Sequence, residues 1–345
     1  MKELSYLAIF TIVLLLTACG KETIPTNVEL IAQTEIGHYV IDDYRTVVTD
    51  DGTLVIMDVN HLISFYDIQN QSPIGQPFFT FSLPGVNPAS FISSMFHFDN
   101  KLWFMGTDTL YVYPSKPVIG QKPLRKITFE NITAPRDFTL NNEILISNGI
   151  PLGEGLSKPF KADLSNLWNS EYENQVYIAP TMPYQGSSYE TIIPRNIHNG
   201  FVFSNSAYGI TICNMADLSV NNHLDLSDQA EFQIIEDKLF VISPGHIFLF
   251  DVSNPAEPKL LDSKNYSGLN MTISMEKKKL LVHSADEKIR SIDFSDPSEL
   301  KLDRVYSIKG VFSMLGSMEL KNNLIYLTAG NQVSAKLIVG KLKDF

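Results

Sequence analysis

Basic residues are scarce in this chain, and no segment concentrates them. Of 345 residues only 27 are Lys or Arg, against 38 Asp or Glu, which leaves a formal net charge of −11. Binding to a nucleic-acid backbone depends on clustered Lys and Arg side chains that displace counterions. We therefore expect no nucleic-acid partner, and a basic or neutral partner suits the chain better than an acidic one.

Charged residues of both signs together make up only 19% of the chain, whereas hydrophobic residues make up 44% and aromatic residues 11%. Disordered proteins have the opposite composition, with high charge and few aromatic residues. The composition therefore indicates a folded protein, and the length is sufficient for one large core or two domains.

The sequence also lacks helical periodicity and the common catalytic motifs. Beyond the N-terminal segment, no stretch places apolar residues at helical spacing over three turns. Short runs of β-branched and aromatic residues recur instead, which predicts an all-β fold. The sequence contains no nucleophile elbow, no phosphate-binding loop and no zinc-binding helix motif, so no catalytic residue can be assigned. We expect no cofactor and no metal, and we favour a binding protein over an enzyme.

The N-terminus carries the pattern of an export signal. Residues 7–16, LAIFTIVLLL, form an apolar run that is too short to span a bilayer and has the length of a signal-peptide core. The run ends in Leu16-Thr17-Ala18-Cys19, which resembles the lipobox of bacterial lipoproteins. The resemblance implies that residues 1–18 are removed and that Cys19 is acylated, with palmitate for example, and holds the chain at a membrane. An ordinary signal peptide with an incidental cysteine is the alternative.

Acylation of Cys19 leaves Cys213 as the only other thiol, so no intrachain disulfide can form. Cys213 lies in an apolar segment, GITIC, and we expect it to be a small buried side chain. Residues 19–27 are mostly polar and predict a flexible tether. The location follows as the bacterial envelope. Gly20 rather than Asp follows the cysteine. If the source is Gram-negative, this residue favours delivery to the outer membrane, where the protein would face the periplasm or the cell surface.

A unit of short strands repeats along the rest of the chain. Each unit has a polar turn, an unbroken apolar triplet, a second turn and an alternating strand. The triplets begin at Leu54, Leu102, Ile144, Phe201, Leu239, Leu280 and Leu324. Their mean spacing, (324 − 54)/6 = 45 residues, is that of a four-stranded propeller blade. Unbroken triplets indicate strands buried on both faces, as in blades that stack around a ring. The sequence therefore predicts a seven-bladed β-propeller.

Two of these units carry a motif of a known family. Residues 246–261, HIFLFDVSNPAEPKLL, and 288–303, KIRSIDFSDPSELKLD, are similar to the LVIVD-repeat type of bacterial propeller, whose repeats contain an Asp-Val-Ser-Asn-Pro turn. Asp, Ser and Asn side chains bond the backbone of such a turn, and Pro fixes the φ angle at its exit. The resemblance implies a propeller fold and export, and it assigns no catalytic residue.

The last unit is one strand short, because residues 312–345 have room for only three strands. Residues 28–36 read like the outer strand of blade five and precede the first full blade. We predict that they complete blade seven and close the ring. The domain plan is then a signal peptide at 1–18, a lipidated tether at 19–27 and a single propeller domain at 28–345.

Two segments of blade three exceed the repeat, at residues 148–158 and 180–190, and we predict long loops there. Both should lie on the face that surrounds the channel mouth, where propellers usually bind ligands. Tyr184 and Tyr189 are candidates to clamp a sugar, a peptide or an apolar ligand. A variable surface loop without a ligand is the alternative.

Three arginines precede or begin innermost strands and are candidates to bind an anionic ligand at the channel mouth: Arg45, Arg136 and Arg195. The alternative is that they form rim ion pairs with the nearby carboxylates of Asp43, Asp137 or Glu190.

Three histidines fall in equivalent turns on the same face and are further ligand-binding candidates: His61, His246 and His283. The absence of local HxH or HxxxH spacing disfavours a metal cluster, so we expect turn or solvent-exposed histidines.

Taken together, these features predict a lipid-anchored envelope propeller that binds a protein or a small ligand on its loop-rich face without catalysis. The alternatives are an envelope hydrolase or lyase that acts on carbohydrate or peptide at the channel mouth, and a scaffold in a membrane-assembly complex.

Overall fold

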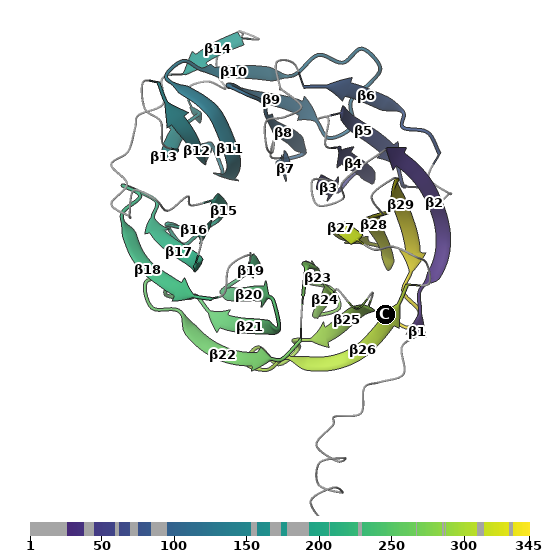
Figure 1. The fold of residues 1–345 in the computed structure, drawn as a ribbon. Helices are drawn as coiled ribbons and strands as arrows, with labels where there is room; N and C mark the ends of the chain where they lie inside the picture. Colours follow the sequence, from purple (N-terminus) through teal and green to yellow (C-terminus); the bar gives the residue numbers. More distant parts are fainter. Residues whose placement is uncertain are drawn as a thin grey trace, which may run out of the picture.

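Seven sheets surround a central axis in the computed structural model of this chain (Figure 1). The structure describes residues 26–37, 45–58, 62–69, 75–83, 95–152, 157–165, 174–177, 193–206, 208–226, 230–266, 268–284, 286, 288–308, 314–330 and 334–345. No helix within these ranges is long and apolar enough to cross a membrane. The predicted all-β, seven-bladed propeller is confirmed.

The strands of each blade follow one another from the axis outwards. Blade one consists of β3 (Arg45–Val48), β4 (Thr53–Met57), β5 (Leu62–Asp67) and β6 (Phe79–Ser82). Blade two consists of β7 (Met95–Phe98), β8 (Lys101–Met105), β9 (Thr109–Pro114) and β10 (Arg125–Phe129). Blade three consists of β11 (Ile132–Asn141), β12 (Ile144–Pro151) and β13 (Lys158–Asp163). Blade four consists of β15 (Ile193–His198), β16 (Phe201–Ser206), β17 (Gly209–Asn214) and β18 (Val220–Asp225).

The remaining blades follow the same order. Blade five consists of β19 (Glu231–Ile235), β20 (Lys238–Ser243), β21 (His246–Asp251) and β22 (Lys259–Lys264). Blade six consists of β23 (Asn270–Ser274), β24 (Lys279–His283), β25 (Lys288–Asp293) and β26 (Lys301–Ser307). Blade seven consists of β27 (Met314–Lys321), β28 (Leu324–Gly330), β29 (Ala335–Lys341) and, outermost, β2 (Glu29–Gly37).

The seven apolar triplets lie in the second strands, as predicted, and are buried on both faces apart from their first residues in blades three and four, Ile144 and Phe201, which are partly buried. All five residues of β4, for example, are buried. The tight turns before these strands have positive φ angles, at Asn100, Asn199 and Asn322 among others. Asn, Asp and Gly tolerate this conformation better than other residues, so the turn residues fix where each inner hairpin reverses.

The Asp-containing turns after the third strands are held by side-chain hydrogen bonds. In blade five the Ser253 backbone N–H and hydroxyl both donate to Asp251 Oδ1, at 2.9 and 2.6 Å, and Lys238 Nζ donates to Asp251 Oδ2 at 2.7 Å. In blade six Lys279 Nζ donates to Asp293 Oδ2 at 2.7 Å. This bond, together with the hydrogen bonds from Ser295, lowers the pKa of Asp293 to about 2. The repeated motif therefore has a structural cause in the turn itself.

The N-terminal strand closes the ring. β2 pairs antiparallel with β29 from Glu29 to Gly37, so the predicted completion of blade seven is confirmed. A short strand before it, β1 (Thr26–Asn27), pairs parallel with β26 of blade six. Strand pairing thus begins at Thr26, two residues before the predicted start of the propeller domain at residue 28.

Blade three departs from the prediction in two ways. β12 continues to Pro151 and pairs with β11 across residues that we expected in a loop, so the predicted loop at 148–158 is shortened. Gly149, within the predicted loop, has a packing role, because a Cβ there would lie 2.1 Å from the Ile132 side chain. In addition, β14 (Asn174–Tyr177) pairs parallel with β10 of blade two, and the described part of blade three has three strands.

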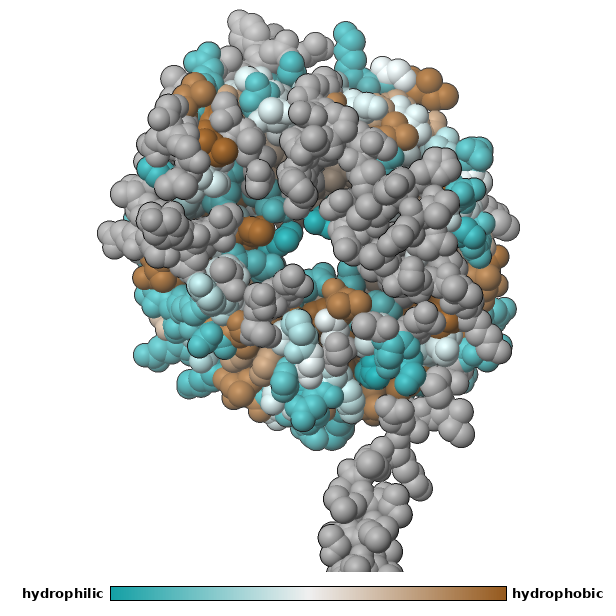
Figure 2. All heavy atoms as spheres, in the orientation of Figure 1, coloured by the Kyte–Doolittle hydropathy of each residue, from teal (hydrophilic) through white to brown (hydrophobic). Residues whose placement is uncertain are grey.

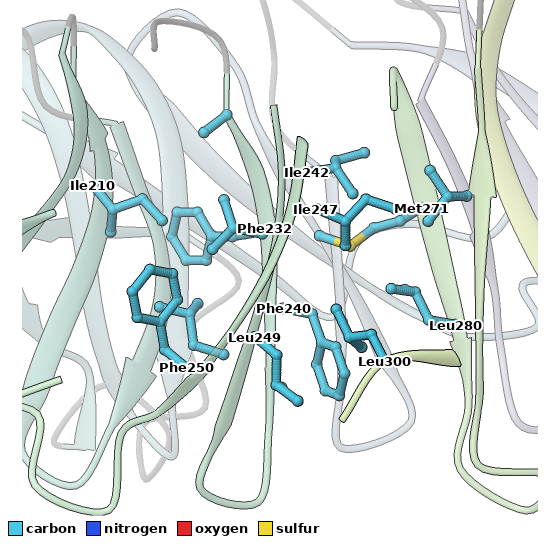
Figure 3. Close-up of a cluster of buried hydrophobic side chains, with 14 of the residues drawn as sticks. Ile210, Phe232, Phe240, Ile242, Ile247, Leu249, Phe250, Met271, Leu280 and Leu300 are labelled. Carbon is cyan, nitrogen blue, oxygen red and sulfur yellow. The ribbon is translucent and has the colours of Figure 1, made fainter. Parts of the chain in front are cut away.

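Apolar side chains pack between adjacent blades rather than in one central core. Figure 3 shows the cluster shared by blades four, five and six, in which Phe240 lies beside Leu300 and Ile247 beside Met271. We call each contact between neighbouring blades a seam and name it by its two blades. Cys213 is fully buried in the 3–4 seam, as expected for a small apolar side chain.

Candidate functional site at the axial channel

The innermost strands border an opening through the centre of the ring. Figure 2 shows this opening, with hydrophilic residues among those at its border. Each innermost strand runs towards the hairpin turn that joins it to the second strand. The first residues of β3, β15 and β19 therefore lie together at the opposite end of the channel, which we call the channel mouth.

Two β-bulges direct an acid and a base towards each other at this mouth. The register of β11 shifts at Asp137 and that of β15 shifts at Arg195, so each residue is the extra one in its strand. A bulge re-aims its side chain, and Arg195 Nη1 lies 3.4 Å from Asp137 Oδ1. The ion pair that we considered as an alternative for Arg195 is therefore present. The Arg195 side chain is still 38% exposed, against 6% for Asp137, so Arg195 keeps access to a ligand.

Glu231, at the start of β19, interacts with both of the described candidate arginines. Burial raises its pKa to about 7, while the charges of Arg195 and Arg45 and a hydrogen bond from the Met271 backbone oppose the rise. Arg45 belongs to blade one and Glu231 to blade five, so their interaction crosses the channel. The mouth thus combines guanidinium groups and a carboxylate from three blades.

Glu319 of β27 is the second carboxylate of the channel. Burial raises its pKa to about 8, and the charge of Glu231 adds to the rise. Both glutamate side chains keep part of their surface exposed, because they border the channel while dense protein surrounds them. A carboxyl with a pKa near 8 holds its proton at neutral pH, so this pair can donate or accept a proton or receive a cationic group.

The two described candidate histidines, His246 and His283, lie in different surroundings. His246 starts β21 with an exposed ring that stacks on Phe248 at a centroid distance of 5.6 Å. His283 ends β24 and is only 2% exposed, so the expected solvent-exposed position is wrong for this residue. Burial lowers its pKa to about 4. Within the described ranges no group of three His, Cys, Asp or Glu residues is arranged to hold a metal ion.

The other candidates fall outside what the structure describes. Tyr184, Tyr189 and His61 lie in undescribed segments, as do Cys19 and the predicted loop at 180–190. The backbone of Arg136 belongs to β11, but its side chain is not described.

Two charged residues of the channel escaped the sequence analysis: Glu231 and Glu319. Their signal was a carboxylate within a short apolar segment that the repeat assigns to an innermost strand. Glu231 directly precedes the apolar FQII, and Glu319 interrupts the segment SMELK.

The comparisons with known proteins show the fold alone. No family model matches the chain, and no curated protein matches it. Among solved structures, the chain is similar to the β-propeller domain of Cps50 (Swd1) from Myceliophteria thermophila. The TM-score is 0.61 at 11% identity, over 91% of this chain and 100% of that one. It is also similar to the WD40 β-propeller domain of Doa1, with a TM-score of 0.59 at 13% identity over 92% of this chain and 98% of that one. These matches show a β-propeller fold.

Proposed function

We propose that the protein is a lipid-anchored propeller of the bacterial envelope that binds a protein or a small ligand at the channel mouth without catalysis. The observation that carries the proposal is the convergence of Arg195, Arg45 and Glu231 from separate blades on one mouth. Opposite charges held on rigid strands are suited to bind a ligand that carries ionic groups.

The membrane anchor rests on the resemblance of residues 16–19 to a lipobox. The first paired residue, Thr26, lies seven residues after Cys19. A fully extended segment of that length spans at most about 25 Å, so an acylated Cys19 would hold the ring close to the bilayer. Metabolic labelling with an alkyne fatty acid tests this anchor. We expect label on the native protein and none on Cys19→Ser, and a native protein without label would contradict the anchor.

Affinity capture of the full-length protein from its native envelope tests the binding function. We expect a specific partner or ligand to be recovered with the native protein and lost with Arg45→Ala or Glu231→Gln. The matched control is Arg304→Ala, which removes an arginine that pairs with Asp344 at 3.0 Å on the outer part of the ring. Capture of nothing by the native protein, together with turnover of a screened substrate, would overturn the proposal.

The two glutamates support a second candidate, an envelope hydrolase or lyase that acts on carbohydrate or peptide. Glu231 and Glu319 have raised pKa values of about 7 and about 8, and such groups serve as general acids or bases near neutral pH. Turnover of a carbohydrate or peptide substrate that is lost in Glu319→Gln would favour this candidate over binding alone.

A further inference from the structure

The turn between the third and fourth strands of blade two differs from the same turn in other blades. We call its residues, 115–124, the blade-two turn. In blades four and six the large apolar residue of this turn is buried, since Leu218 is 1% exposed and Leu300 is 0% exposed. In the blade-two turn Val118 is 66% exposed and Ile119 is 88% exposed. Apolar side chains that are buried elsewhere in the ring therefore face water here.

Hydrogen bonds hold the blade-two turn at both of its ends. The Ser115 backbone N–H donates to the Asn100 carbonyl at 3.1 Å, and the Ser115 hydroxyl donates to Asp51 Oδ2 at 2.5 Å. At the other end the Leu124 N–H donates to the Val112 carbonyl at 2.7 Å. These bonds fasten the turn to the inner hairpins of blades one and two. The turn therefore belongs to the end of the ring opposite the channel mouth, which we call the hairpin face.

The tip of the blade-two turn is a tight turn of its own. The Gln121 N–H donates to the Val118 carbonyl at 2.8 Å, and Gly120 has a φ of +80°, as in a type II turn. Ile119 occupies the second position of this turn, where proline is common. The backbone therefore holds two adjacent apolar side chains outwards. Exposed apolar groups that the fold keeps in place in this way indicate an interaction site.

Basic side chains accompany this apolar tip. Residues 109–129 contain four Lys or Arg residues and no Asp or Glu, although the chain as a whole has a net charge of −11. Two carboxylates of the neighbouring strands and turns already have partners, because Asp67 pairs with Lys116 at 3.3 Å and Asp99 pairs with Lys101. Lys122, beside the tip, is exposed. The blade-two turn therefore presents apolar and positively charged groups together.

The N-terminal tether reaches the ring at the same hairpin face. β2 begins at Glu29, which pairs with Lys341, the last residue of the third strand of blade seven. Third strands end at the hairpin face, and Lys343 Nζ lies 3.8 Å from Glu29 Oε2 just beyond that strand end. Ten residues separate Cys19 from Glu29, a span of at most about 35 Å. A membrane that holds Cys19 would therefore lie within reach of the hairpin face.

The size and charge of the tip favour a membrane over a protein partner. A stable protein interface buries about 800 Å² on each partner, which two apolar side chains do not supply. A lipid interface accepts a few apolar side chains, and nearby Lys side chains strengthen the contact with anionic headgroups. Because the net charge of −11 repels an anionic surface, only this turn is suited to approach one.

We propose that the blade-two turn docks on a membrane that contains anionic lipids, with Val118 and Ile119 in the headgroup region and Lys122 beside the phosphates. The inference rests on the membrane location proposed above and adds a second contact to the lipid anchor. With the hairpin face on the membrane, the channel mouth faces away from it and stays open to ligands.

The test uses the acylated full-length protein in vesicles of phosphatidylglycerol and phosphatidylcholine, with an environment-sensitive fluorophore on Ile119→Cys. With Cys19 acylated and Cys213 buried, this variant has one accessible thiol. We expect a blue-shifted emission that lipids with spin-labelled acyl chains quench. The ratio of inserted to free probe should fall about tenfold or more in pure phosphatidylcholine, and also with Lys122→Glu. Both variants replace exposed residues and should melt at the native temperature.

The matched control is a fluorophore on Leu152→Cys. Leu152 is 61% exposed and follows β12 at the channel-mouth end of the ring, so its probe should stay in water. The proposal is overturned if the probe at residue 119 behaves like the probe at residue 152, or if insertion depends neither on phosphatidylglycerol nor on Lys122. A shift that requires added envelope proteins would indicate a protein partner and would also overturn it.

A failure of the anchor can be told apart from a failure of the docking. If fatty-acid labelling finds no acyl group on Cys19, the same probe is measured on Cys19→Ser protein with added vesicles. Insertion there retains the docking proposal while the anchor is lost, and absence of insertion ends both. An acylated protein whose probe at residue 119 stays in water retains the anchor alone.

Discussion

His283 makes the stability of this propeller sensitive to acid, and its replacement should remove that sensitivity. The side chain lies at the end of β24, 2% exposed, two residues after Leu281 on the face that packs against blade seven. Neither ring nitrogen has a hydrogen-bond partner among the described residues. The informative substitution is His283→Leu, because leucine has a similar volume and no titrating group.

The size of the effect follows from the pKa shift. Burial is the main cause that lowers the pKa of His283 from 6.5 to about 4; the charge of Asp286 opposes it and that of Arg290 adds to it. In the folded state the ring stays neutral, whereas the unfolded chain binds a proton below pH 6.5. The stability that this ring contributes is therefore complete above pH 6.5 and is lost as the pH falls towards 4. A shift of about 2.5 units corresponds to roughly 3 kcal/mol.

Urea unfolding followed by circular dichroism at pH 7, 6, 5 and 4 measures this loss. Because many carboxylates titrate in the same range, the quantity to compare is the difference in unfolding free energy between the native protein and His283→Leu. We expect this difference to shift by roughly 3 kcal/mol in favour of the variant between pH 7 and pH 4. His246→Asn, which removes an exposed imidazole one blade away, should follow the native profile. A constant difference between native and His283→Leu would refute the reasoning.

Three other changes test the ring, one glycine and the channel. Deleting residues 26–36 removes β2 from β29 and should abolish the single cooperative melt, and an unchanged melt would contradict the closure. Gly209→Ala should lower the unfolding free energy by roughly 2 kcal/mol or more, since its φ is +136° and a Cβ would lie 2.1 Å from the Leu224 carbonyl oxygen. Gly75→Ala, in open space, is the control for denaturant unfolding. Glu319 keeps its proton up to about pH 8 in the folded state, whereas the unfolded carboxyl ionises near pH 4.5. The unfolding free energy of the native protein should therefore fall as the pH rises from 4.5 to 8, and that of Glu319→Gln, measured by denaturant unfolding, should lack this contribution.

The fold could be predicted because its signals are local. The triplet that begins at Leu239, for example, follows a turn in which Glu236 has a positive φ, and both features lie within one hairpin. The same local pattern recurs around the ring, so the blade number followed from counting. The closure by β2 could also be predicted, because the last repeat lacked one strand.

The candidate site could be predicted only in part, because it depends on contacts between distant blades. Arg45 and Arg195 could be placed near the mouth from their positions at strand starts. Their common partner Glu231 could not be placed there, because the sequence pattern of a carboxylate at a strand start is equally typical of a solvated turn residue. The bulge at Asp137 is likewise invisible in the sequence, and it decides where that carboxylate points.

The position of the 3–4 seam in the ring explains how the fold tolerates the small apolar cluster there, which has four buried residues among those described. Figure 1 shows blades three and four across the axis from blade seven, where β2 joins the two ends of the propeller. In a closed ring, blades three and four cannot separate unless another seam also moves. Blade three packs against blade two, and blade four packs against blade five, through larger apolar clusters. The β2 pairing thus stabilises the 3–4 seam from the far side of the ring. Loss of β2 should therefore loosen the 3–4 seam as well, and amide hydrogen exchange in β12 and β16 should become faster although neither strand pairs with the deleted one.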